Sequence, residues 1–474
     1  MFNKNHFGFA AERATTYREN VNATSPYPDL GADQLRQLFN TGLPAQGRPG
    51  LDVLAQLAAA AEKGLVGSSG DSFYGWVMGA SDPIGIAADW LTSAWGQNAA
   101  IYQTAPSAAI AEEVAGAWLL DLLRLPKESS FAFTSGATMA SFICLAAARS
   151  EIYHRRGWDL ENDGIFGAPE IRVFVSSEAH SSIYAALRYL GFGANRLIAI
   201  AADQQGAMIV EDLAAQMSKY AGPSIVIAQA GHINTGTFDN FNAICDLAHA
   251  HNSWVHIDGA FGLWANASVQ RRHLGAGSER ADSWAVDGHK WLQIPYDSGF
   301  GFVRDNRAHR RAMSMTAGYL NEAAEDGRNP THFVPELSRR ARGFTVWAVL
   351  QHLGRAGISD IVDGNCDNAG RLAAHLQKIP GVNILHDVVL NQISLTIEDQ
   401  DGQSQTQAVC DKLQAHSIYF VKEADWCGTK IIRLSFSSTT KTDRQIDEFA
   451  SYFSAICRTV LGHKSPSSSV ALSA

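Results

Sequence analysis

Apolar residues recur along the chain in two patterns, one typical of helices and one typical of buried strands. The segments 111–126 and 137–156 carry apolar residues at helical spacing, which predicts helices. Short β-branched runs without polar alternation follow the helical segments; they are 171–177, 196–201, 223–230, 253–260 and 299–304. Continuous apolar strands that alternate with helices are typical of a parallel sheet buried on both faces. The pattern therefore predicts a doubly wound α/β fold.

The same patterns divide the chain into three predicted parts. Residues 1–70 are helical and interrupted by glycine-containing loops, and residues 71–345 form the large α/β domain. Residues 346–474 combine helices with strand-like runs, which predicts a smaller α+β domain. Its last residues, KSPSSSVALSA, are small and serine-rich, so we expect a disordered tail.

Composition and charge exclude several classes of function. The chain has 474 residues, with 38 Lys and Arg against 47 Asp and Glu, and a formal net charge of −9. Because it also has no long basic run, we expect neither nucleic acid nor a membrane as its main partner. Its six cysteines lack metal-ligand spacing, and no segment has the pattern of a signal peptide or a membrane span. We expect a cytoplasmic protein with reduced thiols and no metal.

Four segments carry reactive residues where parallel sheets bind ligands, beyond the carboxyl ends of strands. Lys290 follows a short strand, Asp258 ends the run at 253–258, and His180 follows the run at 171–177. The small-residue loop at 134–138 opens directly onto a predicted helix. Each residue also has an ordinary structural interpretation. Lysines extend along surfaces, aspartate and small residues cap helices, and single histidines pack in cores.

Together the four segments fit the chemistry that pyridoxal 5'-phosphate (PLP) requires. A lysine bonds to the cofactor aldehyde, and an aspartate keeps the pyridine nitrogen protonated, so that the ring accepts electrons from Cα. An imidazole such as that of His180 stacks on the ring. Free backbone N–H groups of Gly136, Ala137 and Thr138, at the start of a helix, would bind the phosphate.

The sequence resembles the group II PLP-dependent amino acid decarboxylases, which act on aromatic amino acids, histidine, glutamate and diaminobutyrate. The resemblance covers most of the chain from about residue 70 and is carried by residues 134–138, His180, 256–260 and 287–291. It implies fold type I, the fold of aspartate aminotransferase. It also implies a homodimer with shared active sites and the conversion of an L-amino acid to its amine and CO2.

The resemblance implies roles for single residues. Lys290 would bind the cofactor covalently, Asp258 would pair with its pyridinium nitrogen, and His180 would stack on its ring and act in catalysis. The residues implied in cofactor binding are Ser135, Gly136, Ala137, Thr138, His180, His232, Asn234, Asp258, Ala260, His289 and Lys290. Whether His232 or Asn234 contacts the cofactor or the substrate carboxylate is left open. Asp287 stands where many members have asparagine, so its contact with the phosphate is also open.

Catalysis and substrate recognition are predicted from further positions. Tyr319, in a polar loop at 310–333, matches the family's proton-donating tyrosine, with a packing tyrosine as the alternative. Trp76, Met78 and Tyr296 would form an apolar, aromatic wall. Arg433 would bind the substrate carboxylate or, equally well, form an ion pair between domains.

These positions favour a substrate with an aromatic or other uncharged side chain. The alternative activity is oxidative decarboxylation to an aldehyde, or carbon–carbon cleavage, on the same fold. Intact Tyr319 and His180 favour simple decarboxylation over these reactions, and intact Lys290 and Asp258 argue against a homologue that only binds a partner.

Overall fold

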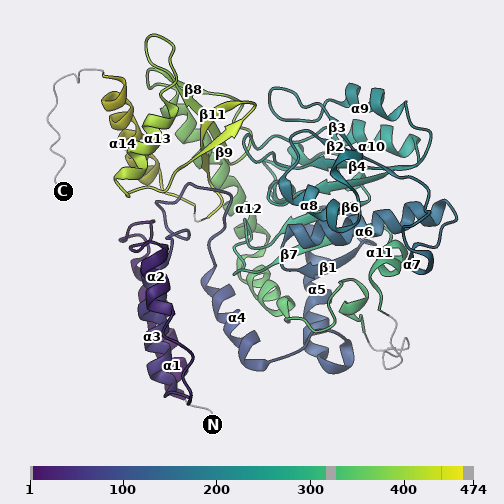
Figure 1. Ribbon diagram of the computed structural model, residues 1–474, viewed down its shortest axis with the longest axis horizontal. Helices are drawn as coiled ribbons and strands as arrows, with labels where there is room; N and C mark the ends of the chain where they lie inside the picture. The colour runs from purple at the N-terminus through teal and green to yellow at the C-terminus, as the bar shows by residue number, and fades with distance from the viewer. Residues whose placement is uncertain (1–3, 316–326, 439, 463–474) are drawn as a thin grey trace. The chain divides into compact units, whose positions relative to one another are not determined.

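The computed structural model describes residues 4–315, 327–438 and 440–462 (Figure 1). The chain divides into two compact units. Unit 1 comprises Met1–Trp76, Ala374–Leu385 and Ser394–Ala474, and unit 2 comprises Val77–Ala373 and His386–Ile393. The division into an arm, a large domain and a small domain stays a prediction.

Unit 2 is built around a sheet whose seven strands, among the described residues, follow the order β1-β7-β6-β5-β4-β2-β3. Their bounds are β1 Ser130–Thr134, β2 Arg172–Ser176, β3 Leu197–Ile200, β4 Ser224–Gln229, β5 Trp254–Asp258, β6 Ser283–Asp287 and β7 Gly299–Val303. The strands from β2 to β6 pair in parallel, as predicted. β7 is antiparallel to β1 and β6. A parallel partner for β6 would need a long crossover, and only residues 288–298 separate β6 from β7.

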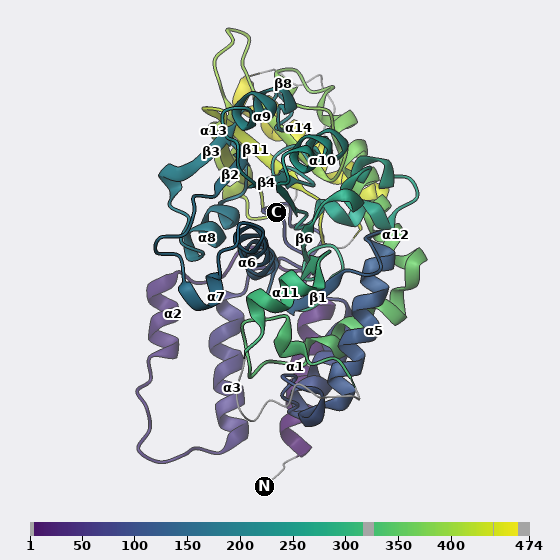
Figure 2. The same ribbon diagram turned by 90° about the vertical axis from the view of Figure 1, so that its right-hand side faces the viewer.

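Helices alternate with these strands, and several of them pack against the sheet. Their bounds are α4 Pro83–Trp95, α5 Pro106–Leu122, α6 Ala137–Arg155, α7 Leu160–Asp163, α8 Ser181–Tyr189, α9 Val210–Met217, α10 Phe241–Ala250, α11 Asn306–Met313 and α12 Arg342–Leu376. α6 crosses one face and contacts β1, β4, β5, β6 and β7 (Figure 2). The predicted helices at 111–126 and 137–156 are thus confirmed as α5 and α6, although α5 ends before Pro126.

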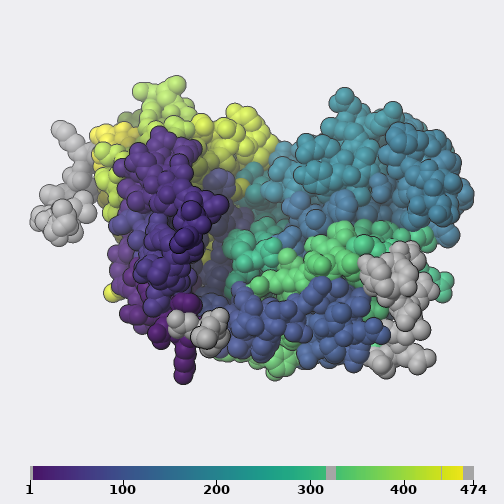
Figure 3. Space-filling view, turned by 60° about the horizontal axis from the view of Figure 1, so that its bottom comes forward, coloured from purple at the N-terminus to yellow at the C-terminus, as the bar shows by residue number. Residues whose placement is uncertain are grey.

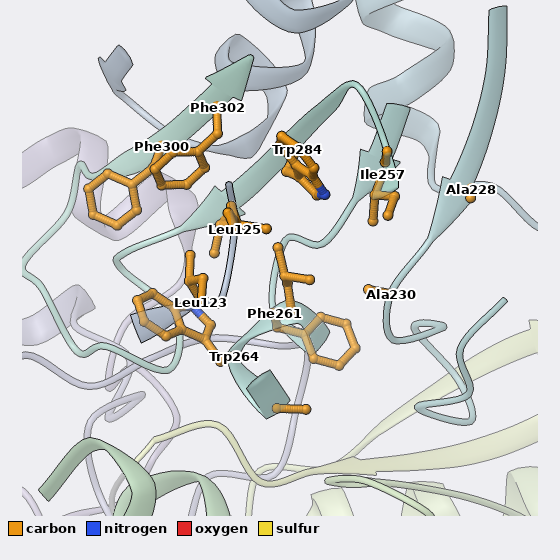
Figure 4. Packing of buried hydrophobic residues seen from close by; sticks show 14 of the residues in the cluster. Leu123, Leu125, Ala228, Ala230, Ile257, Phe261, Trp264, Trp284, Phe300 and Phe302 are labelled. Atoms are coloured by element: carbon orange, nitrogen blue, oxygen red, sulfur yellow. The ribbon is translucent and has the colours of Figure 1, made fainter. Parts of the chain in front are cut away.

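The sheet is buried on both faces, which explains why its strands read as continuous apolar runs. In β4, Ile225 and Ile227 belong to the hydrophobic cluster under α6, whereas Val226 and Ala228 belong to the cluster on the opposite face. Figure 4 shows part of that opposite cluster, in which Trp264 and Trp284 lie near Phe300 and Phe302. Alternate residues of one strand therefore fill two cores.

Unit 1 contains most of a smaller sheet, in the order β10-β11-β9-β8 among the residues described. The bounds of its strands and helices are β8 Val382–Ile384, β9 Gln392–Ile397, β10 Lys422–Trp426, β11 Thr429–Ser435, α1 Lys4–Asn20, α2 Ala32–Phe39, α3 Gly50–Ala61, α13 Thr406–Ala415 and α14 Asp443–Leu461. α3 lies beside both α1 and α2, drawn in purple in Figure 3. The edge strand β10 was not predicted because its sequence, KEADW, is mostly polar.

Three observations on the described residues bear on the expectations about membranes, thiols and metals. None of the described helices is long and apolar enough to cross a membrane. All six cysteines are described and none forms a disulfide; only Cys427 is exposed. Within the described ranges, no group of three or more His, Cys, Asp or Glu side chains is arranged to hold a metal ion.

Candidate active site

A cavity of about 490 Å³, including its open mouth, lies within unit 2 at the carboxyl ends of β4, β5 and β6. Its lining residues are Val77, Ala137, Thr138, His180, Ser182, Gln229, Gly231, Ile233, Asp258, Ala260, Phe261, Asp287 and Lys290. Strand ends converge at this edge because the strands run in parallel. The structure thus brings six of the predicted site residues together: Ala137, Thr138, His180, Asp258, Ala260 and Lys290.

Lys290 lies in the turn after β6, and the backbone there is tightly held. The N–H groups of Gly288 and His289 both donate to the carbonyl of Ser298, at 3.0 and 3.1 Å. A Cβ atom on Gly79 would lie 2.1 Å from the carbonyl oxygen of Lys290, so only glycine fits there. The Lys290 ammonium pairs with Asp287, with 2.9 Å between Nζ and Oδ2. The lysine is therefore positioned by its own turn and by a buried carboxylate.

Asp258 is the last residue of β5, and its carboxyl group is buried in the cavity wall. Burial raises the pKa of Asp258, and the nearby negative charge of Asp287 adds to this shift. Three interactions lower the pKa of Asp258 without cancelling the effect of burial. They are the charges of His180 and Lys290 and a 3.2 Å hydrogen bond from the N–H of Ala260. A carboxylate in such a site favours a cationic or proton-donating ligand beside it.

His180 is the N-cap residue of α8. Its Nδ1 accepts a hydrogen bond from the N–H of Ser182 at 3.3 Å and lies 2.8 Å from the Ser182 hydroxyl oxygen. In the neutral ring, this acceptor role assigns the proton to Nε2. The start of α8 thus fixes the orientation of the imidazole at the cavity.

At the N-terminus of α6, the hydrogen bonding of the backbone N–H groups differs from the prediction made from the sequence. The N–H of Ala137 donates to Asp287 Oδ1 at 2.6 Å, and the N–H of Gly136 donates to the Thr134 hydroxyl at 3.3 Å. The prediction that these N–H groups are free was therefore wrong. The reason is that β6 ends beside the start of α6, which places the Asp287 carboxylate on the helix N-terminus.

The remaining predicted residues of unit 2 do not line the cavity. His289 Nε2 lies 3.3 Å from Asp287 Oδ1, and the His289 ring stacks on that of Tyr296 with 4.3 Å between centroids. His232 is buried, with Nε2 3.4 Å from Glu178 Oε2, and its Nδ1 accepts from the N–H of Asn234 at 3.4 Å. The cavity is lined instead by the neighbours Gly231 and Ile233.

The other predicted residues have the following positions. Ser135, in the turn before α6, and Met78 are both half-buried and do not line the cavity. Trp76, which is exposed, and Arg433, in β11, belong to unit 1. Burial lowers the pKa of the Arg433 guanidinium to about 10. Tyr319 lies outside the described residues.

Sequence reasoning missed several cavity residues. Gln229 ends β4 and is the register partner of Asp258, so it lies at the same sheet edge. The criterion that selected Asp258, a polar residue at the end of an apolar run, would have selected Gln229 as well. The apolar residues Val77, Ile233 and Phe261 carried no comparable signal, because apolar side chains in loops are common.

A comparison with known protein families decides to which family the chain belongs. Residues 32–398 match the family model of the pyridoxal-dependent decarboxylase conserved domain. The chain belongs to the pyridoxal-dependent decarboxylase family. The family, the dependence on PLP and the carboxy-lyase activity predicted from the motifs are thereby confirmed. The enzyme is a PLP-dependent amino acid decarboxylase.

Two relatives and one solved structure illustrate the similarity. The enzyme is 28% identical over 356 residues to an aromatic-L-amino-acid decarboxylase of Bacillus atrophaeus, covering 74% of this chain and 72% of the relative. It is 34% identical over 284 residues to an L-2,4-diaminobutyrate decarboxylase of Rhizobium meliloti, covering 58% and 55%. The crystal structure of Oryza sativa TDC with PLP and tryptamine superposes with a TM-score of 0.90 at 19% identity, covering 97% of this chain and 100% of that one. This likeness confirms fold type I.

The described residues of the decarboxylase fit PLP. The N-terminus of α6 already holds an anion, the Asp287 carboxylate, which shows that it offers an anion-binding position. The carboxyl group of Asp258 is buried at the end of β5, and a negative charge beside the pyridine nitrogen would favour its protonated form. The Lys290 amine lines the same cavity. An anion position, a carboxylate and an amine are the three groups that the phosphate, the ring nitrogen and the aldehyde require.

Proposed function

We propose that the enzyme removes the α-carboxylate of an L-amino acid with an aromatic or other uncharged side chain. One observation carries the choice of side chain. The charged residues among the described cavity lining are His180, Asp258, Asp287 and Lys290, and each is engaged with another or expected at the cofactor. The rest of the lining includes the apolar residues Val77, Ile233 and Phe261. A charged substrate side chain would therefore lack a dedicated counter-charge there.

PLP, when bound, supplies an electron sink for the electron pair that CO2 leaves on Cα. In the proposal, Lys290 binds the cofactor covalently, and Asp258 holds the proton at the pyridine nitrogen. The imidazole of His180 stacks on the ring, in an orientation that Ser182 fixes. The bond at Cα that breaks is selected by orientation, so a fixed ring face favours loss of the carboxylate.

The phosphate end and the substrate end use other predicted residues. We place the phosphate at the N-terminus of α6, near Ser135, Gly136, Ala137 and Thr138, with His289 beside it. The ring of Tyr296 stacks on that of His289 and so helps to position it. We also keep the prediction that Tyr296 forms the wall of the substrate site with Trp76 and Met78. Arg433 is kept as the candidate for the substrate carboxylate, because the planar fork of a guanidinium suits bidentate binding of a carboxylate. His232, Asn234 and Ala260 remain candidates for cofactor contacts.

A substrate panel tests the proposal. The holoenzyme is incubated with each of the twenty amino acids, DOPA, diaminobutyrate and ornithine, and CO2 release is followed. We expect the highest kcat/KM with an aromatic or another uncharged substrate. A higher kcat/KM with diaminobutyrate, ornithine or an acidic amino acid would show that the assignment of side-chain class is wrong.

Tyr319 is proposed to return the proton to Cα after CO2 leaves. Replacing it with phenylalanine is expected to lower amine formation by about 10²- to 10⁴-fold and to raise the share of aldehyde. Amine, aldehyde and peroxide are quantified for the wild type and for Tyr319→Phe. Tyr189→Phe, which removes a hydroxyl from a largely exposed ring, is the control and should behave like the wild type. An unchanged product ratio in Tyr319→Phe would remove this role.

We also infer a homodimer, supported by apolar side chains that are exposed on α4 of a single chain. Trp90, Leu91 and Trp95 are 40%, 51% and 51% exposed. Neighbouring apolar side chains left open to solvent are typical of an association surface. We expect light scattering to give the mass of two chains, and Leu91→Glu with Trp95→Glu to shift it toward one chain and lower activity. Phe166→Glu, at an exposed loop residue, is the control. A fully active monomer would contradict the inference.

A further inference from the structure

Asp287 connects three groups that the proposed function assigns to the cofactor. Its Oδ1 lies 2.6 Å from the backbone nitrogen of Ala137 and 3.3 Å from His289 Nε2. Its Oδ2 lies 2.9 Å from Lys290 Nζ. The Asp287 side chain is only 5% exposed, so solvent screens these contacts weakly.

The Asp287 backbone is anchored on both sides, which holds the carboxylate in place. Its N–H donates to the carbonyl of Ala260 at 2.9 Å, and its carbonyl accepts from Trp264 Nε1 at 3.0 Å. A Cβ atom added to Gly136 would lie 3.2 Å from Asp287 Oδ1, so the carboxylate sits tightly against the turn before α6. Only the two side-chain torsions of Asp287 are left to move the carboxylate away from the start of the helix.

We propose that Asp287 is a built-in competitor of the cofactor phosphate. In the cofactor-free enzyme its carboxylate takes the anion position at the N-terminus of α6, and a bound phosphate has to displace it or tolerate its charge. The proposal rests on the placement of the phosphate in the proposed function. Two anions at one helix N-terminus repel each other, so Asp287 weakens cofactor binding. The same carboxylate stabilises the cofactor-free site, since it satisfies the Ala137 N–H and the Lys290 ammonium.

The ion pair between Asp287 and Lys290 offers a second explanation for any change in cofactor affinity. The experiment has to distinguish the two explanations. Removing the Asp287 charge also releases Lys290, which would act at the aldehyde end of the cofactor. Pyridoxal carries the aldehyde but no phosphate. A change at the phosphate end therefore alters binding of PLP but not of pyridoxal, whereas a change at Lys290 alters both.

The test compares the wild type with Asp287→Asn, which keeps the shape of the side chain and removes its charge. Cofactor-free protein is titrated with PLP and with pyridoxal, and binding is followed by visible absorbance. We expect the dissociation constant for PLP to fall about 10- to 100-fold in D287N, and that for pyridoxal to stay the same. In addition, inorganic phosphate should raise the melting temperature of cofactor-free D287N more than that of the wild type.

Asp297→Asn is the matched control. Asp297 is a carboxylate in the turn between β6 and β7, paired with Arg342 at 3.0 Å, and its side chain is 46% exposed. This variant should leave both dissociation constants unchanged. Asp287→Ser is a second charge-removing variant, for use if D287N does not fold.

Two results would overturn the proposal. One is an unchanged or weaker affinity of both Asp287 variants for PLP, and the other is an equal gain for PLP and pyridoxal. Failure of the proposed function looks different, because the substrate panel would then give the highest kcat/KM with a charged amino acid, whatever the affinities of the Asp287 variants.

Discussion

Replacing Lys290 with alanine is expected to lower kcat/KM by a factor on the order of 10⁴ or more and to abolish the visible absorbance that PLP confers. The reason is that Lys290 is the lysine that lines the described part of the cavity, and without its amine the cofactor has no covalent partner. CO2 release and the absorbance of the dialysed protein measure the two effects.

The controls for this prediction separate the amine from the charge. Lys290→Arg keeps a cation near Asp287 but cannot bond to the aldehyde, so it should be as inactive as the alanine variant. Lys219→Ala removes a lysine from outside the cavity and should leave activity and colour unchanged. A coloured, active Lys290→Ala protein would refute the assignment.

Replacing Asp258 with asparagine is expected to lower kcat by about 10²- to 10⁴-fold while making the cofactor-free protein more stable. The loss of activity follows because asparagine cannot hold a proton on the pyridine nitrogen. The gain in stability follows from the raised pKa of Asp258, since burial disfavours its charged form. Residues that lower the stability of the folded protein but serve the reaction are typical of active sites.

The stability effect has a defined pH dependence. Because the pKa of Asp258 is raised on folding, its contribution to the free energy of unfolding is complete at low pH and is lost as the pH rises through the folded-state pKa. Cofactor-free Asp258→Asn and wild type should therefore melt alike in acid. At neutral pH the variant should melt higher, by about 1 to 2 °C for each 1 kcal/mol gained. Melting curves over this pH range test the prediction.

A buried aspartate outside the cavity provides the matched control. Asp239 is buried to a similar degree, and burial raises its pKa to about 6. Its carboxylate, however, accepts hydrogen bonds from the backbone N–H groups of Met208 and Gln229, each at 2.7 Å. Asp239→Asn should therefore lose stability at neutral pH yet keep the colour of bound PLP. If Asp258→Asn behaved in the same way, Asp258 would be a structural residue.

Much of the fold could be predicted because the local pattern of apolar residues indicates which segments are buried. The runs at 171–177, 223–230 and 253–260 became β2, β4 and β5, since strands covered on both faces have few polar positions. The antiparallel direction of β7 carried no such signal. An apolar run looks the same in either direction, and the length of the connection after β6 decides its pairing.

The sequence by itself determined the family and predicted which residues meet at the cavity. Lys290, Asp258, His180 and the loop at 134–138 each lie at or after the end of a strand, and parallel strands end at one edge, so their convergence was implied by the pattern. Tertiary structure alone decided how these groups pair. The hydrogen bond from Ala137 to Asp287 joins positions 150 residues apart, across the contact between α6 and β6. Local sequence encodes burial and backbone shape, but contacts between distant side chains depend on sheet order and register, which bring an acidic residue to the helix N-terminus expected to bind the phosphate.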